Sequence, residues 1–151
     1  MEKDWTTQQV ETMPVIALRG LTIFPNVLIH FDVAREISIK ALEEAMTAGS
    51  PVFLVGQKDL AVEKPEAKDL YTVGTVSKVR QILRMPGDNV RVMVEGLCRG
   101  SLDELKRTSP YLEAVVRTIP AEKAGNNSAK TEALIRSTYE MFQQYTELAP
   151  K

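Results

Sequence analysis

Residues 72–97 have the sequence TVGTVSKVRQILRMPGDNVRVMVEGL. Two runs rich in valine, isoleucine and threonine flank the tetrapeptide PGDN, whose residue types favour tight turns. This pattern predicts a β-hairpin with strands 72–85 and 90–97 and a four-residue loop. Gly74 and Gly96 lie inside the strand patterns, and we expect a bulge or a bend at each of them.

The length of this loop fixes which residues of the two strands face each other. With four loop residues, one face of the hairpin is apolar and the other is mostly polar. The predicted pairs are Met85–Val90, Leu83–Val92 and Gln81–Val94 on one face, and Arg84–Arg91, Ile82–Met93 and Arg80–Glu95 on the other. We expect the outermost pair, Met85 and Val90, to project beyond the core at the hairpin tip.

Other segments predict further strands and one helix. Short apolar runs indicate strands at 13–18, 51–55 and 111–119. An alternating strand at 27–33 has one apolar side, formed by Val27, Ile29, Phe31 and Val33. Helical spacing over 35–48 gives an apolar stripe of Ile37, Ala41, Leu42, Ala45 and Met46, followed by Gly49 as a C-cap. The charged segment 57–69 is predicted to be a surface loop.

These segments together indicate an α+β fold, with a β-rich lobe over 13–119 that contains one internal helix. Residues 1–12 are predicted to be a polar tail and 120–127 a linker. An amphipathic helix over 129–148, capped by Asn127 or Ser128, is expected to begin a helical subdomain over 128–151 that the chain end truncates.

The apolar stripe of this last helix requires a partner, because a short helix is marginal in water by itself. Its members are Leu134, Ile135, Met141, Phe142, Tyr145 and Leu148. We expect contacts through Leu134, Met141, Phe142 and Tyr145, either to the β-rich lobe or to another copy of the chain.

Charge and composition exclude several classes of protein. The chain has 19 basic and 20 acidic residues and a net charge of −1, so it lacks the basic field that non-specific nucleic-acid or membrane binding needs. A single cysteine, Cys98, allows no internal disulfide and fits a cytoplasmic location. No apolar run approaches the roughly 18 residues of a membrane-spanning helix.

The sequence contains no recognisable catalytic or metal site. It has no G-x-x-x-x-G-K-[ST] phosphate loop, and its one histidine and one cysteine are too few for a zinc site. We interpret His30 as a surface residue of a strand and Cys98 as a small buried apolar group. No local motif selects a serine–lysine pair. We therefore expect no catalytic residue, cofactor or metal in this chain.

Four segments, in this order and at this spacing, carry a resemblance to a known family. They are PVIALRG at 14–20 leading to Phe24-Pro25, VARE-x-S at 33–38, YTVGTV at 71–76 and VEGL-x-R at 94–99. In these segments the chain resembles the N-terminal domain of Lon-type ATP-dependent proteases over about 13–119. The family usually has glycine where this chain has Ala34, so either the φ angle of Ala34 is negative or its backbone is strained.

The resemblance implies a PUA-like β-rich lobe followed by a helical segment. In full-length Lon enzymes, an AAA+ ATPase that uses ATP and magnesium and a serine–lysine protease follow this domain. The resemblance also implies roles in recognising unfolded, damaged or degron-bearing proteins and in assembling a homohexamer with other Lon subunits.

We accordingly expect a non-catalytic module that binds exposed apolar segments of unfolded client proteins. The candidate client-binding residues lie in the 21–25 connection and at the hairpin tip, and they are Leu21, Phe24, Pro25, Leu83, Met85 and Val90. One alternative is a PUA-like RNA-binding domain, which the charge balance and the aromatic content of 6% disfavour. Another is a purely structural oligomerisation segment that uses the last helix.

Overall fold

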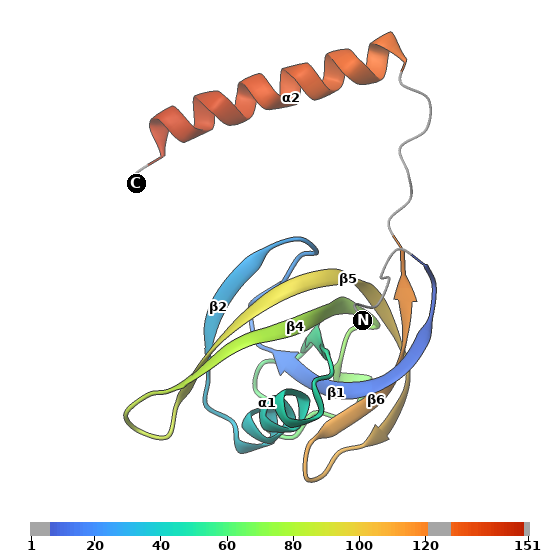
Figure 1. The fold of residues 1–151 in the computed structure, drawn as a ribbon, viewed down its shortest axis with the longest axis vertical. Coiled ribbons are helices and arrows are strands. Elements are labelled where there is room, and N and C mark those ends of the chain that lie inside the picture. The colour runs from blue at the N-terminus through green and yellow to red at the C-terminus, as the bar shows by residue number, and fades with distance from the viewer. Residues whose placement is uncertain (1–6, 121–127, 150–151) are drawn as a thin grey trace. The chain divides into compact units, whose positions relative to one another are not determined.

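A mixed six-stranded sheet with one helix packed against it forms the first unit of the chain (Figure 1). The computed structural model describes residues 7–120 and 128–149 and separates two units, Met1–Ala121 and Glu122–Lys151. The elements of the first unit are β1 (Val10–Leu18), β2 (Leu28–Val33), α1 (Glu36–Ala48), β3 (Val52–Gly56), the 3-10 helix η1 (Ala67–Asp69), β4 (Val73–Arg84), β5 (Val90–Arg107) and β6 (Leu112–Ile119). The second unit contains α2 (Ala129–Leu148).

The strand order of the sheet is β2-β5-β4-β3-β1-β6, and β6 also pairs with β5. This second pairing is possible because β5 is 18 residues long. Its first part pairs with β2 and its last part, from Arg99 to Arg107, pairs with β6. Strands β5, β4, β3, β1 and β6 therefore close a ring, and β2 extends from β5 as an edge strand.

Two apolar clusters fill the unit, one on each side of β1 and β3. Ile16 and Leu18 of β1 belong to the first cluster, together with Ala41, Leu42 and Ala45 of α1. The intervening residues Val15 and Ala17 belong to the second cluster. Because both faces of these strands are buried, their sequences are continuous apolar runs, and this explains why they were recognisable as buried strands.

The α+β prediction is confirmed, with one internal helix in a β-rich lobe and a helix after it. Gly49 ends α1 with φ 68° and donates its N–H to the Ala45 carbonyl, as expected. Met46 was expected in the buried stripe of α1, but its side chain is exposed. Ser38, which was not expected in the stripe, is buried. The φ angle of Ala34 is not positive, so the turn before α1 forms without that strain.

Two predicted boundaries were wrong. β1 begins at Val10, because residues 10–12 pair with β6, so the polar tail does not extend to residue 12. β5 continues ten residues past Leu97 to Arg107, since β4 and then β6 supply hydrogen-bonding partners along its length. Tail residues 1–6 and the expected linker residues 121–127 lie outside the described residues.

The predicted hairpin register was also wrong, by one residue. Val90 pairs with Arg84, and Val92 pairs with Ile82. Five residues, 85–89, connect the strands, because the Met85 N–H donates to the Asn89 carbonyl (2.8 Å) inside the loop. A register shift between Val79 and Gln81 then increases the offset to two residues, so that Val79, not Gln81, pairs with Val94. The valines of β5 therefore face the core, while the side chain of Leu83 is exposed.

The two strand glycines have different roles. The pairing shifts between Val76 and Ser77 of β4, opposite Gly96, so the irregularity expected at Gly96 is confirmed. A bulge or a bend was expected at Gly74 as well, but Gly74 pairs regularly with Gly100 and no bulge forms there. A Cβ at Gly74 would instead lie 2.5 Å from the Leu54 carbonyl oxygen, so glycine permits a close approach of β3 and β4 there.

Helix α2 has the predicted bounds and the predicted cap. The Ser128 hydroxyl accepts the Thr131 N–H at 3.2 Å. None of the helix residues is buried, and the exposed large side chains are Leu134, Ile135, Tyr139, Met141, Phe142, Tyr145 and Leu148. The rings of Phe142 and Tyr145 stack with centroids 6.4 Å apart.

Gly74→Ala should destabilise the first unit by about 1–3 kcal/mol, because the added methyl group meets rigid backbone of β3. Chemical unfolding monitored by far-ultraviolet circular dichroism measures this change. Gly56→Ala is the matched control, since its nearest neighbour is the side chain of Tyr71 at 3.2 Å, which is exposed and can move. Equal stability of the two variants would show that β3 and β4 separate at little cost.

Candidate functional site

The connection between β1 and β2 presents an exposed aromatic ring at a fixed position. Ile23 is 2% exposed and belongs to the first apolar cluster, against which Leu21 also packs. The next side chain, Phe24, is 54% exposed. Burial of the neighbouring Ile23 therefore anchors the backbone that carries the Phe24 ring.

Polar contacts to the Ile23 carbonyl reinforce this anchor. It accepts a hydrogen bond from the fully buried Thr75 hydroxyl at 2.5 Å and from Nη1 of Arg99 at 3.5 Å. Arg99 Nη1 also donates to Thr75 Oγ1 at 3.1 Å. The Arg99 guanidinium lies 5.1 Å from the centroid of the Phe24 ring, within the range of a cation–π interaction. Arg99 thus contacts both the backbone and the ring of the connection.

The turn that follows Phe24 is fixed to β5 at Gly96. Asn26, at φ 65°, donates its N–H to the Gly96 carbonyl, and Gly96 donates to the Val27 carbonyl, both at 2.9 Å. A Cβ at Gly96 would overlap the Phe24 carbonyl oxygen, so only glycine permits this approach. Phe24, Val27 and Leu28 are all exposed, and we refer to these three side chains as the Phe24–Leu28 ridge.

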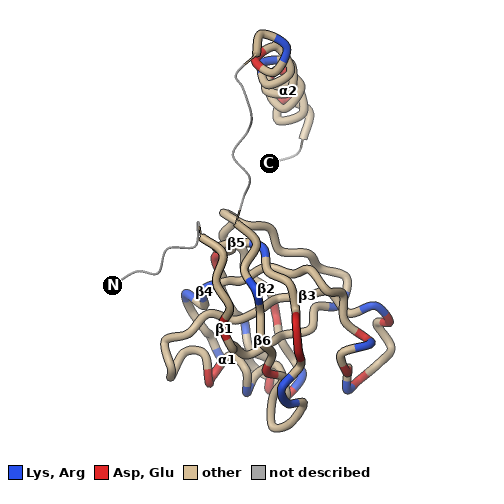
Figure 2. Tube along the Cα trace, turned by 90° about the vertical axis from the view of Figure 1, so that its right-hand side faces the viewer, with Lys and Arg blue, Asp and Glu red and all other residues tan. Residues whose placement is uncertain are grey.

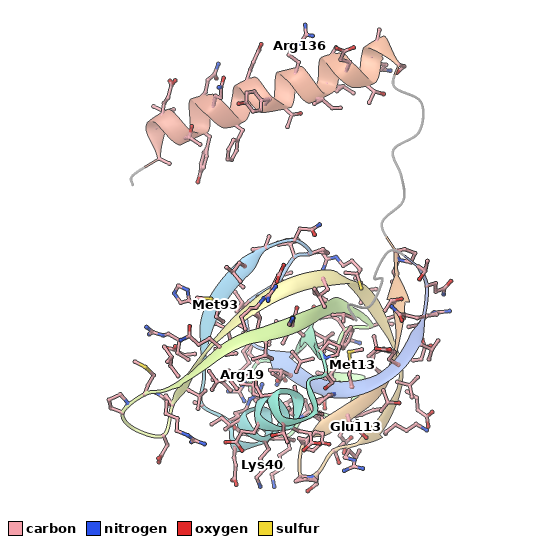
Figure 3. The ribbon with its side chains drawn as sticks, in the orientation of Figure 1. Met13, Arg19, Lys40, Met93, Glu113 and Arg136 are labelled. Carbon is pink, nitrogen blue, oxygen red and sulfur yellow. The ribbon has the colours of Figure 1, made fainter. Side chains whose placement is uncertain are left out.

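The predicted surface at the hairpin tip is smaller than expected. Val90 is 2% exposed, so its assignment to an exposed client-binding surface was wrong; the core extends to the end of β5, where Val90 pairs with the buried Val33 of β2. Met85 is half-buried, and Leu83 is 46% exposed on the outer face. Leu83 and Met93, the latter labelled in Figure 3, line a shallow hollow of about 230 Å³ with His30, Gln81 and Arg91.

The hairpin tip and the Phe24 turn are two separate places on the first unit. The turn is fixed at Gly96, six residues along β5 from Val90, which corresponds to roughly 20 Å of extended strand. A surface that joined Met85 to Phe24 would have to cross the whole region where β2 and β5 pair. The structure therefore offers two candidate patches.

The segments that carry the family resemblance also meet at Arg35. Its guanidinium donates to the Ala17 carbonyl at 2.7 Å and to Gln57 Oε1 at 3.0 Å. Burial lowers the pKa of Arg35 from its usual value, and Arg19 nearby lowers it further. Gln57, expected in a surface loop, is buried and donates to the Asp59 and Val62 carbonyls. We interpret this junction as structural, because backbone and amide oxygens accept the hydrogen bonds of Arg35.

A groove of about 820 Å³ beside this junction has balanced charges. Its basic and acidic lining residues are Arg19, Arg35, Lys40 and Lys64 against Glu36, Glu63 and Glu66. Figure 2 shows basic and acidic residues interspersed over the trace of the first unit. Neither place concentrates one sign of charge.

The arginines of the hairpin are each paired with a carboxylate. Arg80 pairs with Glu95, Arg84 with Glu43 at 2.7 Å, and Arg91 with Asp32 at 2.8 Å. The hydrogen bond from Arg91 lowers the pKa of Asp32. Such pairing leaves little positive charge for an RNA backbone and disfavours the RNA-binding alternative.

Cys98 and His30 lie in different surroundings within the first unit. The Cys98 thiol is buried, and burial raises its pKa to about 11, so it is protonated at neutral pH. His30 is exposed on the outer face of β2. Within residues 7–120 and 128–149, no helix is long and apolar enough to cross a membrane.

Sequence reasoning missed Thr75 and Arg99, which position the Phe24 turn. Both belong to the segments that carry the family resemblance, but their roles were not predicted. Both are polar residues inside strand patterns that otherwise belong to the core. Because buried polar groups require hydrogen-bonding partners, this position could have indicated that each of them contacts another segment.

Comparisons with known proteins agree with this architecture. Residues 12–151 match the family model described as the ATP-dependent protease La (LON) substrate-binding domain. A Lon protease of Lachnoclostridium phytofermentans is 41% identical over 140 residues, which is 93% of this chain and 17% of the relative. The chain thus spans less than a fifth of the length of that relative.

Solved structures share the fold at low sequence identity. A Lon N-terminal domain protein from Xanthomonas campestris has a TM-score of 0.66 at 11% identity, covering 88% of this chain and 74% of that chain. The N-terminal domain of a Mycobacterium avium complex Lon protease has a TM-score of 0.57 at 14% identity, covering 91% and 76%. Together with the family match over almost the whole chain, the described fold leads to one assignment: this chain belongs to the Lon substrate-binding domain family.

Proposed function

We propose that this chain is the non-catalytic substrate-recognition and assembly part of a longer ATP-dependent protease. Its family is defined by substrate binding, and its relatives are Lon proteases of much greater length. ATP and magnesium bind, and a serine–lysine pair cleaves peptide bonds, in parts of the parent protein outside this chain. The parent works in the cytoplasm as a homohexamer.

The bound clients are unfolded or damaged proteins that expose apolar segments. The observation that supports this most is the Phe24 ring, which is exposed although its backbone and one ring face are held by Thr75, Gly96 and Arg99. A ring held in this way loses little conformational freedom when a client covers it. Together with Leu21, Pro25 and the rest of the Phe24–Leu28 ridge, it provides a small apolar contact.

Estimates of the binding free energy favour weak binding by each copy of the chain. An apolar patch that buries about 300 Å² yields roughly 7 kcal/mol before costs. The loss of translational and rotational freedom costs about 4–15 kcal/mol, so one copy binds at about millimolar strength or weaker. Several copies in a hexamer raise the effective affinity by about 10²–10⁴.

Phe24→Ser should weaken binding of a permanently unfolded protein by about tenfold, because it removes most of the apolar area at the centre of the ridge. The melting temperature should change little, since the Ile23 anchor and the backbone bonds at Gly96 remain. Binding is measured by nuclear magnetic resonance titration with reduced, carboxymethylated α-lactalbumin.

Leu60→Ser is the matched control for this experiment. Leu60 is exposed to a similar extent, 51%, but lies in the loop between β3 and η1. If Leu60→Ser lowers the affinity as much as Phe24→Ser does, binding depends on general surface hydrophobicity and the ridge is not the site.

The hairpin tip is a second candidate patch, formed by Leu83 and Met85. Methionine adapts its shape to varied partners, and Leu83 is exposed beside it. Met85→Asp should reduce client binding by about threefold to tenfold with little change in the melting curve, because Met85 is only half-buried. A collapse of folding would instead assign Met85 to the core, and unchanged binding would leave the Phe24–Leu28 ridge as the single contact.

Helix α2 is proposed to make an apolar contact through Leu134, Met141, Phe142 and Tyr145, either with the first unit or with another copy. This proposal rests on the exposure of these side chains along a helix of 20 residues. Phe142→Glu should lower the melting temperature by several degrees or convert a dimer to a monomer, because a charge enters an apolar contact. Calorimetry and light scattering measure the two effects.

Gln143→Glu controls for the added charge, because residue 143 projects from a different side of the helix. If Phe142→Glu behaves like Gln143→Glu in both measurements, the stripe makes no contact in this chain.

A further inference from the structure

Strand β2 has a neighbour on one side only. It is the first strand in the sheet order, and among the described residues β5 is its sole strand partner. Figure 1 shows it at the margin of the sheet. A strand at an edge presents unpaired N–H and C=O groups that can hydrogen-bond to another extended chain.

The pairing with β5 identifies which groups of β2 are unpaired. The Val27 carbonyl accepts from Gly96, and β2 then continues along β5 without a register shift. In an antiparallel pair, alternate residues direct their N–H and C=O groups to the partner. Leu28, His30 and Asp32 therefore direct these groups away from β5. No backbone hydrogen bond from these three residues to another described segment is present.

This edge lacks the features that normally block pairing. Edge strands are often protected by proline, lysine, a bulge or a covering element. The sequence of β2, LIHFDV, contains neither proline nor lysine, and its pairing is regular. Its one charged residue, Asp32, is paired with Arg91 on the outer face. The Phe24–Leu28 ridge leads directly into the strand, since Leu28 is its first residue.

A side-chain pocket lies next to the same edge. Phe31 and Val33 of β2, Ile16 and Leu18 of β1, and Leu21 of the connection are among the residues that line a hollow of about 240 Å³. An added strand would direct every second side chain toward the core side of the sheet. Arg19, Asp32, Arg35 and Ser38 also line the hollow, and its apolar side, formed by β1, β2 and Leu21, can accept one such side chain.

We propose that an extended segment of an unfolded client adds to the free edge of β2 as a further strand. This inference rests on the proposed function and specifies how the client is held. Hydrogen bonds from the client backbone to Leu28, His30 and Asp32 are independent of the client sequence, which suits a domain with many clients. The Phe24–Leu28 ridge and the hollow beside Phe31 add a preference for apolar side chains.

Amide hydrogen exchange of the whole chain tests this placement without any substitution. With reduced, carboxymethylated α-lactalbumin at about the millimolar dissociation constant, where half of the chain is bound, the amides of Leu28, His30 and Asp32 should exchange about twofold more slowly. The amides of Ile29 and Phe31 should change much less, because they already face β5. Equal slowing of all five amides, or of none, would overturn the proposal.

A proline substitution tests the same hydrogen bonds. His30→Pro removes an N–H that faces away from β5, and edge strands tolerate proline at such positions. His30→Ala is the matched control, since it removes the side chain but keeps the N–H. We expect His30→Pro to bind the unfolded probe about tenfold more weakly than His30→Ala. If His30→Pro melts at a much lower temperature, its weaker binding is not informative, and the exchange pattern of the native chain decides whether a client strand adds to β2.

The outcomes separate this inference from the proposed function. If Phe24→Ser weakens binding but the alternating exchange pattern is missing, the apolar contact remains and strand addition is wrong. If the probe does not bind at all, the proposed function fails first. If Leu28, His30 and Asp32 become protected as the concentration of the chain rises without probe, a second copy covers the edge and the inference is overturned.

Discussion

The pairing of β5 with three other strands is the interaction on which the rest of the structure depends. β4 accompanies it along most of its length, β2 pairs with its first part and β6 with its last part. A strand of 18 residues cannot remain flat over that length, because strands twist. The curvature brings β6 next to β1 and closes the ring. Strand β2 pairs with β5 outside this ring and remains an edge strand. Both apolar clusters and the position of the free edge follow from this one strand.

The same strand fixes the exposed features that we connect with function. At Gly96 the backbone of the β1–β2 connection approaches β5 so closely that no side chain fits, and three residues later Arg99 contacts Phe24 and the Ile23 carbonyl. Ile23 is buried, and the side chain of its neighbour Phe24 is exposed. An exposed aromatic ring on a loose loop would collapse onto the nearest apolar surface. Here the hydrogen bonds at Thr75 and Gly96 oppose that collapse.

Much of the fold followed from residue patterns, and the failures have physical causes. The elements and most of their bounds were predictable because apolar periodicity and turn residues are local properties. The register of the β4–β5 hairpin was not, because one hydrogen bond, from Met85 to Asn89, adds a residue to the loop and exchanges the faces of β4. The last part of β5 was missed because its exposed positions carry Asp103, Glu104 and Lys106, residue types that are uncommon in strands, although its partner β6 follows within a few residues.

The candidate site was predictable only in part for the same reason. Phe24 and Pro25 could be identified as an apolar connection, but their separation from the hairpin tip depends on where the connection crosses β5. Val90 was misplaced because β2, a strand distant in sequence, pairs with β5 as far as Val90 and extends the core to the end of the strand. The roles of Thr75 and Arg99 could not be predicted, because they depend on the Ile23 carbonyl, to which both side chains donate hydrogen bonds. Local patterns therefore predict which residues are apolar, and long-range pairing decides which of them solvent reaches.

Under the proposed function, a domain that binds many unrelated clients faces a conflict between exposure of apolar surface and stability, and the free edge of β2 offers a physical resolution. A large apolar patch would bind more tightly, but it would also associate with copies of itself. The exposed apolar side chains that we assign to client binding are divided between the Phe24–Leu28 ridge and the separate hairpin tip. Backbone groups of an edge strand add binding energy that requires no further apolar surface, and a six-residue strand limits how much another chain can pair with it. Weak side-chain contacts and a short free edge can therefore act together on a client, while neither alone is enough to hold a folded neighbour.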